Sequence, residues 1–256
     1  MRVTVVGCSG SFAGPTSPAS CYLVQAEHAG RTWSVALDLG SGALGALQRH
    51  LDPRALDAVV LSHLHPDHCI DLCGLFVLQK YHPDGPSDRL PVHAPVGTAR
   101  RLTQAYGLED GTGLDGYFQF EDLVDGQPFV VGPFTVTPLA VRHPVPAFGL
   151  RVAADGAVLA YTGDTDRCAA LGPLMTGAGL VLADSAFVQG RDSATGIHMN
   201  GAQCAQAALA AGGVGRLMLT HIPAWNDPEV CRAQAAAHWL GEVELAEPDR
   251  TYDLSP

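Results

Sequence analysis

Positive charge is scarce in this sequence. Only 16% of the 256 residues are charged, and 15 Lys and Arg stand against 26 Asp and Glu, which gives a net charge of −11. Nucleic acids are polyanions that proteins hold mainly with Lys and Arg. Because an acidic chain repels such a partner, extended nucleic acid is disfavoured as a ligand.

Long apolar segments are absent as well. The sequence contains no run of about 18 apolar residues, the length that a membrane-spanning helix needs. The N-terminus opens on Arg2 and a strand-like alternation, and not on a charged region followed by an apolar signal segment. We therefore expect a cytoplasmic protein that has no membrane partner.

A disulfide framework is missing too. The cysteines are odd in number and lack the spacing of a disulfide-stapled domain; they are Cys8, Cys21, Cys69, Cys73, Cys168, Cys204 and Cys231. Reduced and mostly buried thiols are the expected state. Cys69 and Cys73 stand four residues apart beside a histidine cluster, so the sequence leaves open whether one of them touches the site.

The order of segments predicts an α/β fold. Residues 2–7, 21–25 and 33–38 are rich in β-branched or aromatic residues, which is typical of strands. Strand-like and helical segments then alternate, and a Gly- and Asp-rich stretch at 109–126, interpreted as a surface excursion, separates them from a second half of the same kind. We predict a single domain over residues 1–256, with two packed sheets and helices outside.

The densest group of polar residues forms the pattern HxHxDH after a predicted strand at 56–61. It consists of His63, His65, Asp67 and His68. So many metal-capable side chains on one turn fit a metal site better than a solvated loop. His63 and His65 would point to the same side of an extended backbone and share one ion, while Asp67 and His68 would face a neighbouring position. Two adjacent metal ions therefore fit better than one.

Three further polar residues follow predicted strands in the second half. They are His143, Asp164 and His221, and Gly163 frees the turn that would aim the Asp164 carboxylate. A lone histidine after a strand is an ordinary feature. Three such residues in a chain that already has HxHxDH predict the remaining metal ligands.

With these motifs the chain resembles the metallo-β-lactamase superfamily, whose usual metal motifs are all present in order. The resemblance implies an α/β fold of four layers, αββα, with two mixed sheets and helices outside. It also implies two sets of metal ligands and one bridge, which are His63, His65 and His143; Asp67, His68 and His221; and Asp164 between them.

Two later residues resemble the ribonuclease Z and phosphodiesterase branch of that superfamily. Asp184 in Leu-Ala-Asp-Ser-Ala and His198 in Gly-Ile-His-Met-Asn match an acidic residue and a late histidine that pair beside the metals. The candidate catalytic residues are therefore Asp67, His198 and Asp184. In ribonuclease Z an arm that clamps tRNA is inserted between the third histidine and the bridging aspartate, whereas here only residues 144–163 lie between them.

Other segments resemble actinobacterial cyclic-nucleotide phosphodiesterases of this branch. They include Gly-Cys-Ser-Gly-Ser, Pro-Ala-Ser-Cys-Tyr-Leu and Leu-Thr-His-Ile-Pro-Ala-Trp. The backbone N–H groups of the loop Gly7–Gly14 are candidates for holding a phosphate oxygen. The resemblance implies a small-molecule nucleotide as the partner, and a homodimer stays open.

We therefore expect a binuclear metal-dependent hydrolase, a phosphodiesterase that acts on a 3′,5′-cyclic nucleotide such as cAMP through a metal-bridging hydroxide. Zn²⁺ suits the ligands, and Mn²⁺ or Fe²⁺ could occupy the same groups. The alternative is a ribonuclease Z-like RNA endonuclease or exonuclease, which the acidity and the missing arm disfavour. An electron-transfer diiron protein would carry Glu in place of His65, and a metal-stabilised binding protein would have lost ligands or His198.

Overall fold

The computed structural model describes residues 1–108 and 113–256. Its first sheet has seven strands in the order β14-β1-β2-β3-β4-β5-β6. The bounds are β1 Arg2–Gly7, β2 Cys21–His28, β3 Arg31–Leu37, β4 Ala58–Val60, β5 Leu90–Ala94, β6 Phe118–Asp122 and β14 Thr251–Asp253. The strands from β3 to β6 are parallel to one another, and the others pair antiparallel, so the sheet is mixed.

The second sheet also has seven strands, in the order β13-β12-β11-β10-β9-β8-β7. The bounds are β7 Phe129–Val131, β8 Phe134–Ala140, β9 Phe148–Ala154, β10 Ala157–Tyr161, β11 Leu180–Asp184, β12 Leu217–Thr220 and β13 Val243–Leu245. The strands from β10 to β13 are parallel, and β8 runs in the same direction because β9 is antiparallel to both β8 and β10. The carboxyl ends of β8, β10, β11 and β12 therefore lie at one edge.

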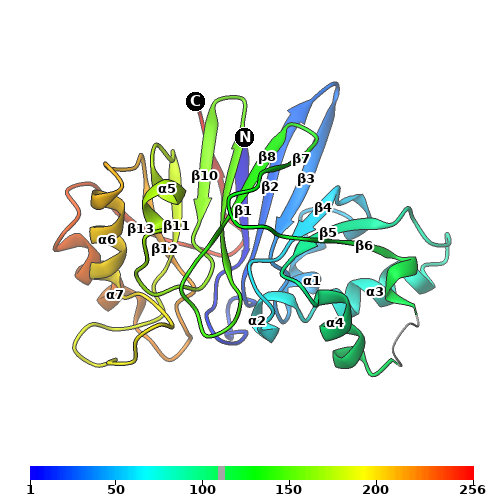
Figure 1. The fold of residues 1–256 in the computed structure, drawn as a ribbon, viewed down its shortest axis with the longest axis horizontal. Coiled ribbons are helices and arrows are strands. Elements are labelled where there is room, and N and C mark those ends of the chain that lie inside the picture. The colour runs from blue at the N-terminus through cyan, green and yellow to red at the C-terminus, as the bar shows by residue number, and fades with distance from the viewer. Residues whose placement is uncertain (109–112) are drawn as a thin grey trace.

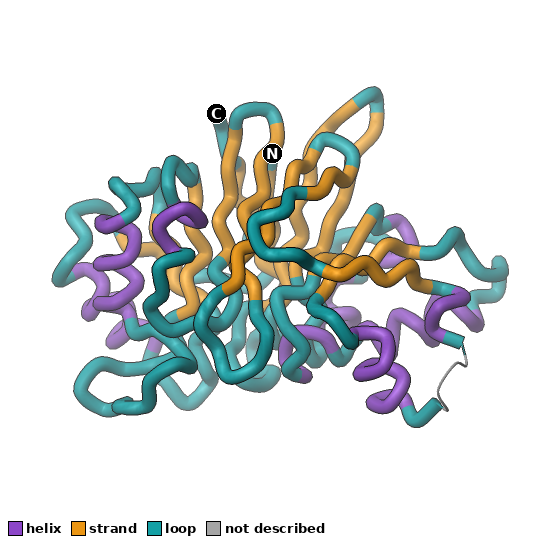
Figure 2. The backbone as a smooth tube through the Cα atoms, in the orientation of Figure 1, coloured by secondary structure: helices purple, strands orange, loops and turns teal. Residues whose placement is uncertain are grey.

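Helices cover the outer face of each sheet (Figures 1 and 2). The α-helices are α1 Ala43–Leu47, α2 Pro66–Cys69, α3 Leu72–Tyr81 and α4 Thr98–Tyr106 beside the first sheet, and α5 Leu171–Met175, α6 Gly201–Ala210 and α7 Pro228–Ala236 beside the second. Two short 3₁₀ helices are η1 Pro53–Ala55 and η2 Leu114–Gly116. No helix in the described ranges combines the length and the apolar character needed to cross a bilayer.

Alternation along the strands produces three apolar layers. In β11, Leu180 and Leu182 face the core between the sheets, while Val181 and Ala183 pack with the helices outside. The strands β1 and β2 alternate in the same way between the inter-sheet core and the layer under α1 and α3. Strands with both faces buried read as continuous apolar runs. The predicted αββα sandwich of two mixed sheets is confirmed.

One segment differs from the prediction of a surface excursion at 109–126. Residues 109–112 lie outside the described residues, but Phe118–Asp122 forms β6, which pairs in parallel with β5. In this strand Phe118 and Phe120 alternate with polar residues, which is a strand pattern. The prediction was wrong there because the surrounding Gly and Asp residues concealed that pattern. Phe118 is completely buried under the helical layer.

Candidate metal centre

The HxHxDH segment crosses from β4 into α2 at the edge where the strands named above end. His65 has extended backbone and precedes Pro66, which begins the helix, so Asp67 and His68 lie in its first turn. His63, Asp67 and His68 are all buried. Figure 1 shows α2 at the edge of the sandwich opposite to the two chain termini.

Three histidine rings and one carboxylate converge in a first cluster. His63, His65, His143 and Asp164 each offer a ligand atom within 4.8 Å of the others. His65 Nδ1 lies 3.0 Å from His63 Nε2 and 3.1 Å from His143 Nε2.

Hydrogen bonds on the far side of two of these rings assign their protons. His143 Nδ1 donates to the carbonyl oxygen of Ile197, and His63 Nδ1 lies 3.1 Å from the hydroxyl of Ser62. Burial lowers the pKa of His63 and of His143, so both rings are neutral. Their Nε2 lone pairs then face His65 Nδ1, which can carry at most one proton. A cation held by all three nitrogens removes this conflict.

A second cluster lies beside the first and comprises Asp67, His68, Asp164 and His221, all buried. His68 Nε2, Asp164 Oδ1 and His221 Nε2 have no hydrogen-bond partner among the described residues. Buried polar atoms are almost always satisfied, and three unsatisfied ones in a cluster whose ligand atoms lie within 4.8 Å of one another fit a ligand that they share. The donor set of imidazole and carboxylate fits Zn²⁺, Mn²⁺ or Fe²⁺.

Asp164 belongs to both clusters. Its Oδ1 lies 3.2 Å from His68 Nε2, and its Oδ2 lies 3.2 Å from His221 Nε2 and 3.7 Å from His63 Nε2. Burial opposes the charge of Asp164, but these three histidines outweigh it and lower the pKa well below its usual range. Gly163 has φ +56°, and a Cβ there would lie 2.7 Å from the Phe148 carbonyl oxygen, so the turn that aims Asp164 requires glycine.

The charge around His68 favours a cation. Burial alone would lower the pKa of this ring, but the carboxylates of Asp164 and Asp38 outweigh it and raise the pKa well above its ordinary value. Burial likewise opposes the charge of Asp67, yet its contact with His68 helps to lower the pKa of that carboxyl below its usual range. Because a histidine binds a metal through an unprotonated nitrogen, a proton and a metal ion compete for His68 Nε2.

Asp38 is a residue of the candidate site that the sequence analysis missed. It follows β3, is fully buried, and accepts hydrogen bonds from His68 Nδ1 at 2.7 Å and Tyr161 Oη at 2.7 Å. The Ser62 backbone N–H and hydroxyl donate to it as well, at 2.6 and 2.8 Å. A carboxylate behind a ligand histidine fixes the tautomer that presents Nε2 to a metal. Asp38 is the last residue of the predicted strand at 33–38. Asp164 was selected because it follows a predicted strand, and the same criterion would have found Asp38.

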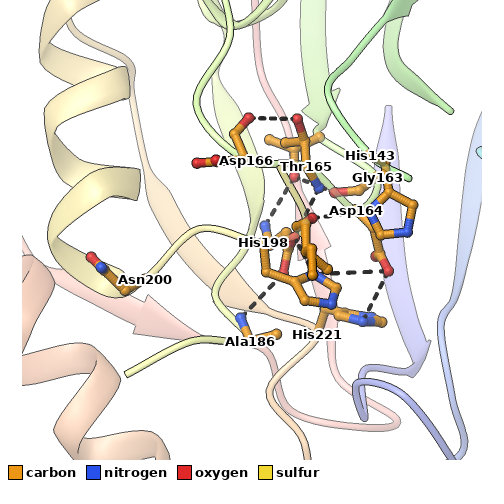
Figure 3. A network of polar contacts seen from close by, with 12 residues as sticks. His143, Gly163, Asp164, Thr165, Asp166, Ala186, His198, Asn200 and His221 are labelled. Atoms are coloured by element: carbon orange, nitrogen blue, oxygen red, sulfur yellow. Dashed lines mark hydrogen bonds and ion pairs between the residues drawn. The ribbon is translucent and has the colours of Figure 1, made fainter. Parts of the chain in front are cut away.

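His198 and Asp184 form the predicted pair, and Figure 3 shows His198 beside Asp164 and His221. His198 Nδ1 lies 2.9 Å from Asp184 Oδ2 and 4.0 Å from Asp164 Oδ2. Burial would lower the pKa of His198, but the Asp184 carboxylate overcomes it and raises the pKa to about 9. The loop that carries His198 ends at Asn200, the N-cap of α6. The side chains of Asn200 and Gln203 each accept a hydrogen bond from the other residue's backbone N–H, which forms a capping box.

The structure answers two smaller questions from the sequence. Neither Cys69 nor Cys73 belongs to a ligand cluster among the described residues, and burial raises the pKa of both thiols, to about 12 for Cys69. In the Gly7–Gly14 loop the backbone N–H groups of Cys8, Ser9, Gly10, Phe12 and Gly14 donate within the protein. Those of Ser11 and Ala13 have no acceptor among the described residues, so the expectation of a phosphate-holding loop narrows to these two groups.

Two hollows adjoin His198. The larger, of ≈ 590 Å³, is walled mostly by polar and charged side chains, among them Arg142, Asp166 and Asn200. The smaller, of ≈ 220 Å³, has Phe187 and Trp225 in its wall. A small molecule that reaches the two ligand clusters has room on both sides of His198.

Comparison with known proteins identifies the family. A family model described as a beta-lactamase superfamily domain matches residues 35–222. The chain belongs to the metallo-β-lactamase superfamily. An uncharacterized protein of Mycobacterium tuberculosis is 41% identical over 258 residues, covering 99% of this chain and 92% of that protein.

Two further superfamily members have more informative names. The "Probable metallo-hydrolase YhfI" of Bacillus subtilis is 32% identical over 248 residues, covering 96% of this chain and 97% of YhfI. The crystal structure of YhfI matches with a TM-score of 0.86 over 98% of this chain and 99% of that one, at 28% identity. Ribonuclease Z of Mycobacterium marinum is 29% identical over 274 residues, covering 96% of this chain and 95% of that protein.

Proposed function

We propose that this member of the metallo-β-lactamase superfamily is a metal-dependent phosphodiesterase that hydrolyses a small 3′,5′-cyclic nucleotide such as cAMP to the 5′-monophosphate. One observation carries the proposal. A histidine held by a carboxylate, His198 on Asp184, stands beside Asp164, which joins two clusters of metal-type ligands. An acid next to a binuclear site is what hydrolysis of an unactivated diester requires.

The metal ligands would be those of the two clusters, and Zn²⁺ is the proposed ion. Two bound divalent ions would supply a water acidified to near neutrality and positive charge for the phosphate oxygens. The similarity to YhfI, which is named a metallo-hydrolase, supports hydrolysis as the reaction class. Asp67, with its lowered pKa, stays ionised and can serve as a ligand at the second cluster.

His198 is proposed to protonate the leaving group. In the reaction the water oxygen bonds to phosphorus, the bond from phosphorus to O3′ breaks, and O3′ must gain a proton because an alkoxide is a poor leaving group. His198 Nδ1 is engaged by Asp184, which leaves Nε2–H as the donor. A pKa of about 9 keeps that proton in place at neutral pH. Asp184 acts as the positioning residue.

The alternative function is that of a ribonuclease Z, and the 29% identity to a ribonuclease Z supports it. Two features favour a cyclic nucleotide instead. Between His143 and Asp164 the chain forms only the hairpin of β9 and β10, which turns at Asp155 and Gly156, so no clamping arm stands there. The net charge of −11 also disfavours a long polyanion.

The proposal is tested by assaying the Zn²⁺-loaded protein with cAMP, cGMP, a linear dinucleotide, a tRNA precursor and a β-lactam. We expect cyclic-nucleotide hydrolysis whose KM varies little with salt, since one phosphate releases few counterions. We expect no site-specific cleavage of the tRNA precursor. Efficient tRNA processing with inert cyclic nucleotides would reverse the ranking.

A further inference from the structure

An exposed aromatic pair stands beside the candidate site. Phe12 lies in the loop after β1, and Trp225 lies in the loop after β12 that begins with His221. Their ring centroids are 4.9 Å apart, although the side chains are 41% and 62% exposed. Large rings left in water cost free energy that burial would recover, so a ring placed at a site entrance calls for a ligand.

Trp225 lines a hollow whose wall also includes His198. This hollow has a volume of ≈ 220 Å³, and its wall includes Ser11, Phe187, His198, Pro223 and Trp225. The ring of Phe187 meets that of His198 edge-on at 5.1 Å between centroids. A flat, apolar group in this hollow would have an aromatic ring on its wall and the proposed proton donor within the same space.

The loops that carry the pair are firmly held. Asn226 is buried, its side chain donates to the Ala186 carbonyl oxygen at 2.7 Å, and its backbone N–H closes a turn onto Pro223 at 2.8 Å. On the other loop, Gly10 donates to Ile222 at 3.2 Å, and a Cβ on Gly10 would lie 2.2 Å from the His221 carbonyl oxygen. The aromatic pair is therefore fixed in position relative to the second ligand cluster before any ligand binds.

We propose that Trp225, backed by Phe12, is the stacking surface for the nucleobase of the substrate. The inference rests on the proposed phosphodiesterase function and assigns the part of the substrate that is remote from the reacting phosphate. Every nucleobase has a flat π-face, and stacking on an aromatic side chain holds it without hydrogen-bond recognition. Base and phosphate are then held at once, the base at Trp225 and the phosphate at the two clusters beside His198.

The test compares two phosphomonoesters that differ only by the base. AMP and ribose 5-phosphate are titrated calorimetrically into the Zn²⁺-loaded protein, with no turnover in either case. Wild-type protein is expected to bind AMP more tightly, and Trp225→Ala to lose about 5- to 100-fold in AMP affinity, the usual effect of removing a base-stacking ring. The affinity for ribose 5-phosphate should change far less. The gap in affinity between AMP and ribose 5-phosphate should therefore close.

Three controls accompany the titration. Trp225→Phe keeps an aromatic face and should retain most of the gap, whereas Tyr81→Ala removes a similarly exposed ring, 64% exposed at the end of α3, and should retain all of it. In unmodified protein AMP should quench tryptophan fluorescence and ribose 5-phosphate should not, which needs no variant to fold.

The outcomes separate this inference from the proposed function. Hydrolysis of cAMP with an AMP affinity that is indifferent to Trp225→Ala overturns the stacking surface and leaves the phosphodiesterase intact. Equal binding of AMP and ribose 5-phosphate to the wild type, without quenching, also overturns it. A gap that depends on Trp225 in a protein that cleaves no phosphodiester supports the stacking surface while the reaction class fails.

Discussion

Replacing Asp38 with Asn tests how far the metal centre depends on the residue behind it. Asp38 Oδ1 accepts from the Ser62 N–H, and Oδ2 accepts from Ser62 Oγ, Tyr161 Oη and His68 Nδ1. The residue is fully buried and has φ +61°, a conformation that asparagine tolerates. Asp38→Asn therefore changes the hydrogen-bonding character of one atom while the backbone stays in place.

The cost follows from what the amide nitrogen can do. If the Asn oxygen keeps the Ser62 N–H, its NH₂ faces Ser62 Oγ, Tyr161 Oη and His68 Nδ1, all of which were donors. The hydroxyls can rotate to accept, but His68 can accept at Nδ1 only by moving its proton to Nε2, the atom that faces the second cluster. We expect metal affinity there to fall about 10- to 100-fold. Loss of the charge-assisted bonds should lower the free energy of unfolding by about 1.5–3 kcal/mol each.

The assay is Zn²⁺ competition with a chelator, together with urea unfolding of the metal-free protein. Asp249→Asn is the matched control, since Asp249 also has positive φ, at +66°, but its side chain is 47% exposed and pairs with Arg49 and His50. Its stability change should be below about 1 kcal/mol. Binding of both metal equivalents to Asp38→Asn with wild-type affinity would refute the tautomer argument.

Three other predictions concern the same centre. Asp164→Ala should lower metal content and turnover together, as measured by elemental analysis and kcat, because its two oxygens face both clusters; loss of only one of the two would contradict the bridge. His198→Ala should keep its metal but lose about 10²–10⁴ in kcat on an alkyl diester and less on a nitrophenyl ester. His198 must be protonated to act, so the alkyl-diester rate of the wild type should fall as pH rises through about 9, while equal pH profiles for both esters would remove the acid role. Chelation should lower the unfolding midpoint, since ligand at 1,000 times its Kd stabilises the folded state by about 4.1 kcal/mol.

Much of the candidate metal centre could be predicted because its ligand-type residues can be recognised from short local sequence patterns. HxHxDH is a contiguous pattern, and His143, Asp164 and His221 each follow an apolar strand, so residue type and position were both readable. The β-sandwich gathers these strand ends at one edge, since β8, β10, β11 and β12 run in one direction. The two ligand sets implied by the resemblance match two of the three groups of ligand-type residues in the described part of the chain, and the third group joins Asp184 and His198 to Asp164 and His221.

What the sequence could not show depends on contacts between distant segments. Asp38 looked like the last residue of a strand, and only the packing of the two sheets against each other brings it to His68 and Tyr161. Phe12 and Trp225 are unremarkable in their own loops, and their pairing appears only when β1 and β12 are placed in space. The strand β6 was hidden because Gly and Asp residues surround its alternating Phe118 and Phe120, and its pairing with β5 is what reveals it.

The backbone at the strand ends explains why these residues converge so closely. Asp38 and His221 have φ +61° and +56°, a left-handed conformation that costs a non-glycine residue about 1–2 kcal/mol. Both follow strands whose buried side chains fix the chain direction, and both are fully or almost fully buried themselves. At these turns Asp38 Oδ2 lies 2.7 Å from His68 Nδ1, and His221 Nε2 lies 3.2 Å from Asp164 Oδ2. Local strain at the turns of Asp38 and His221 is thus balanced by the surrounding sandwich, and a substitution that relaxed either turn would move a side chain away from the candidate centre.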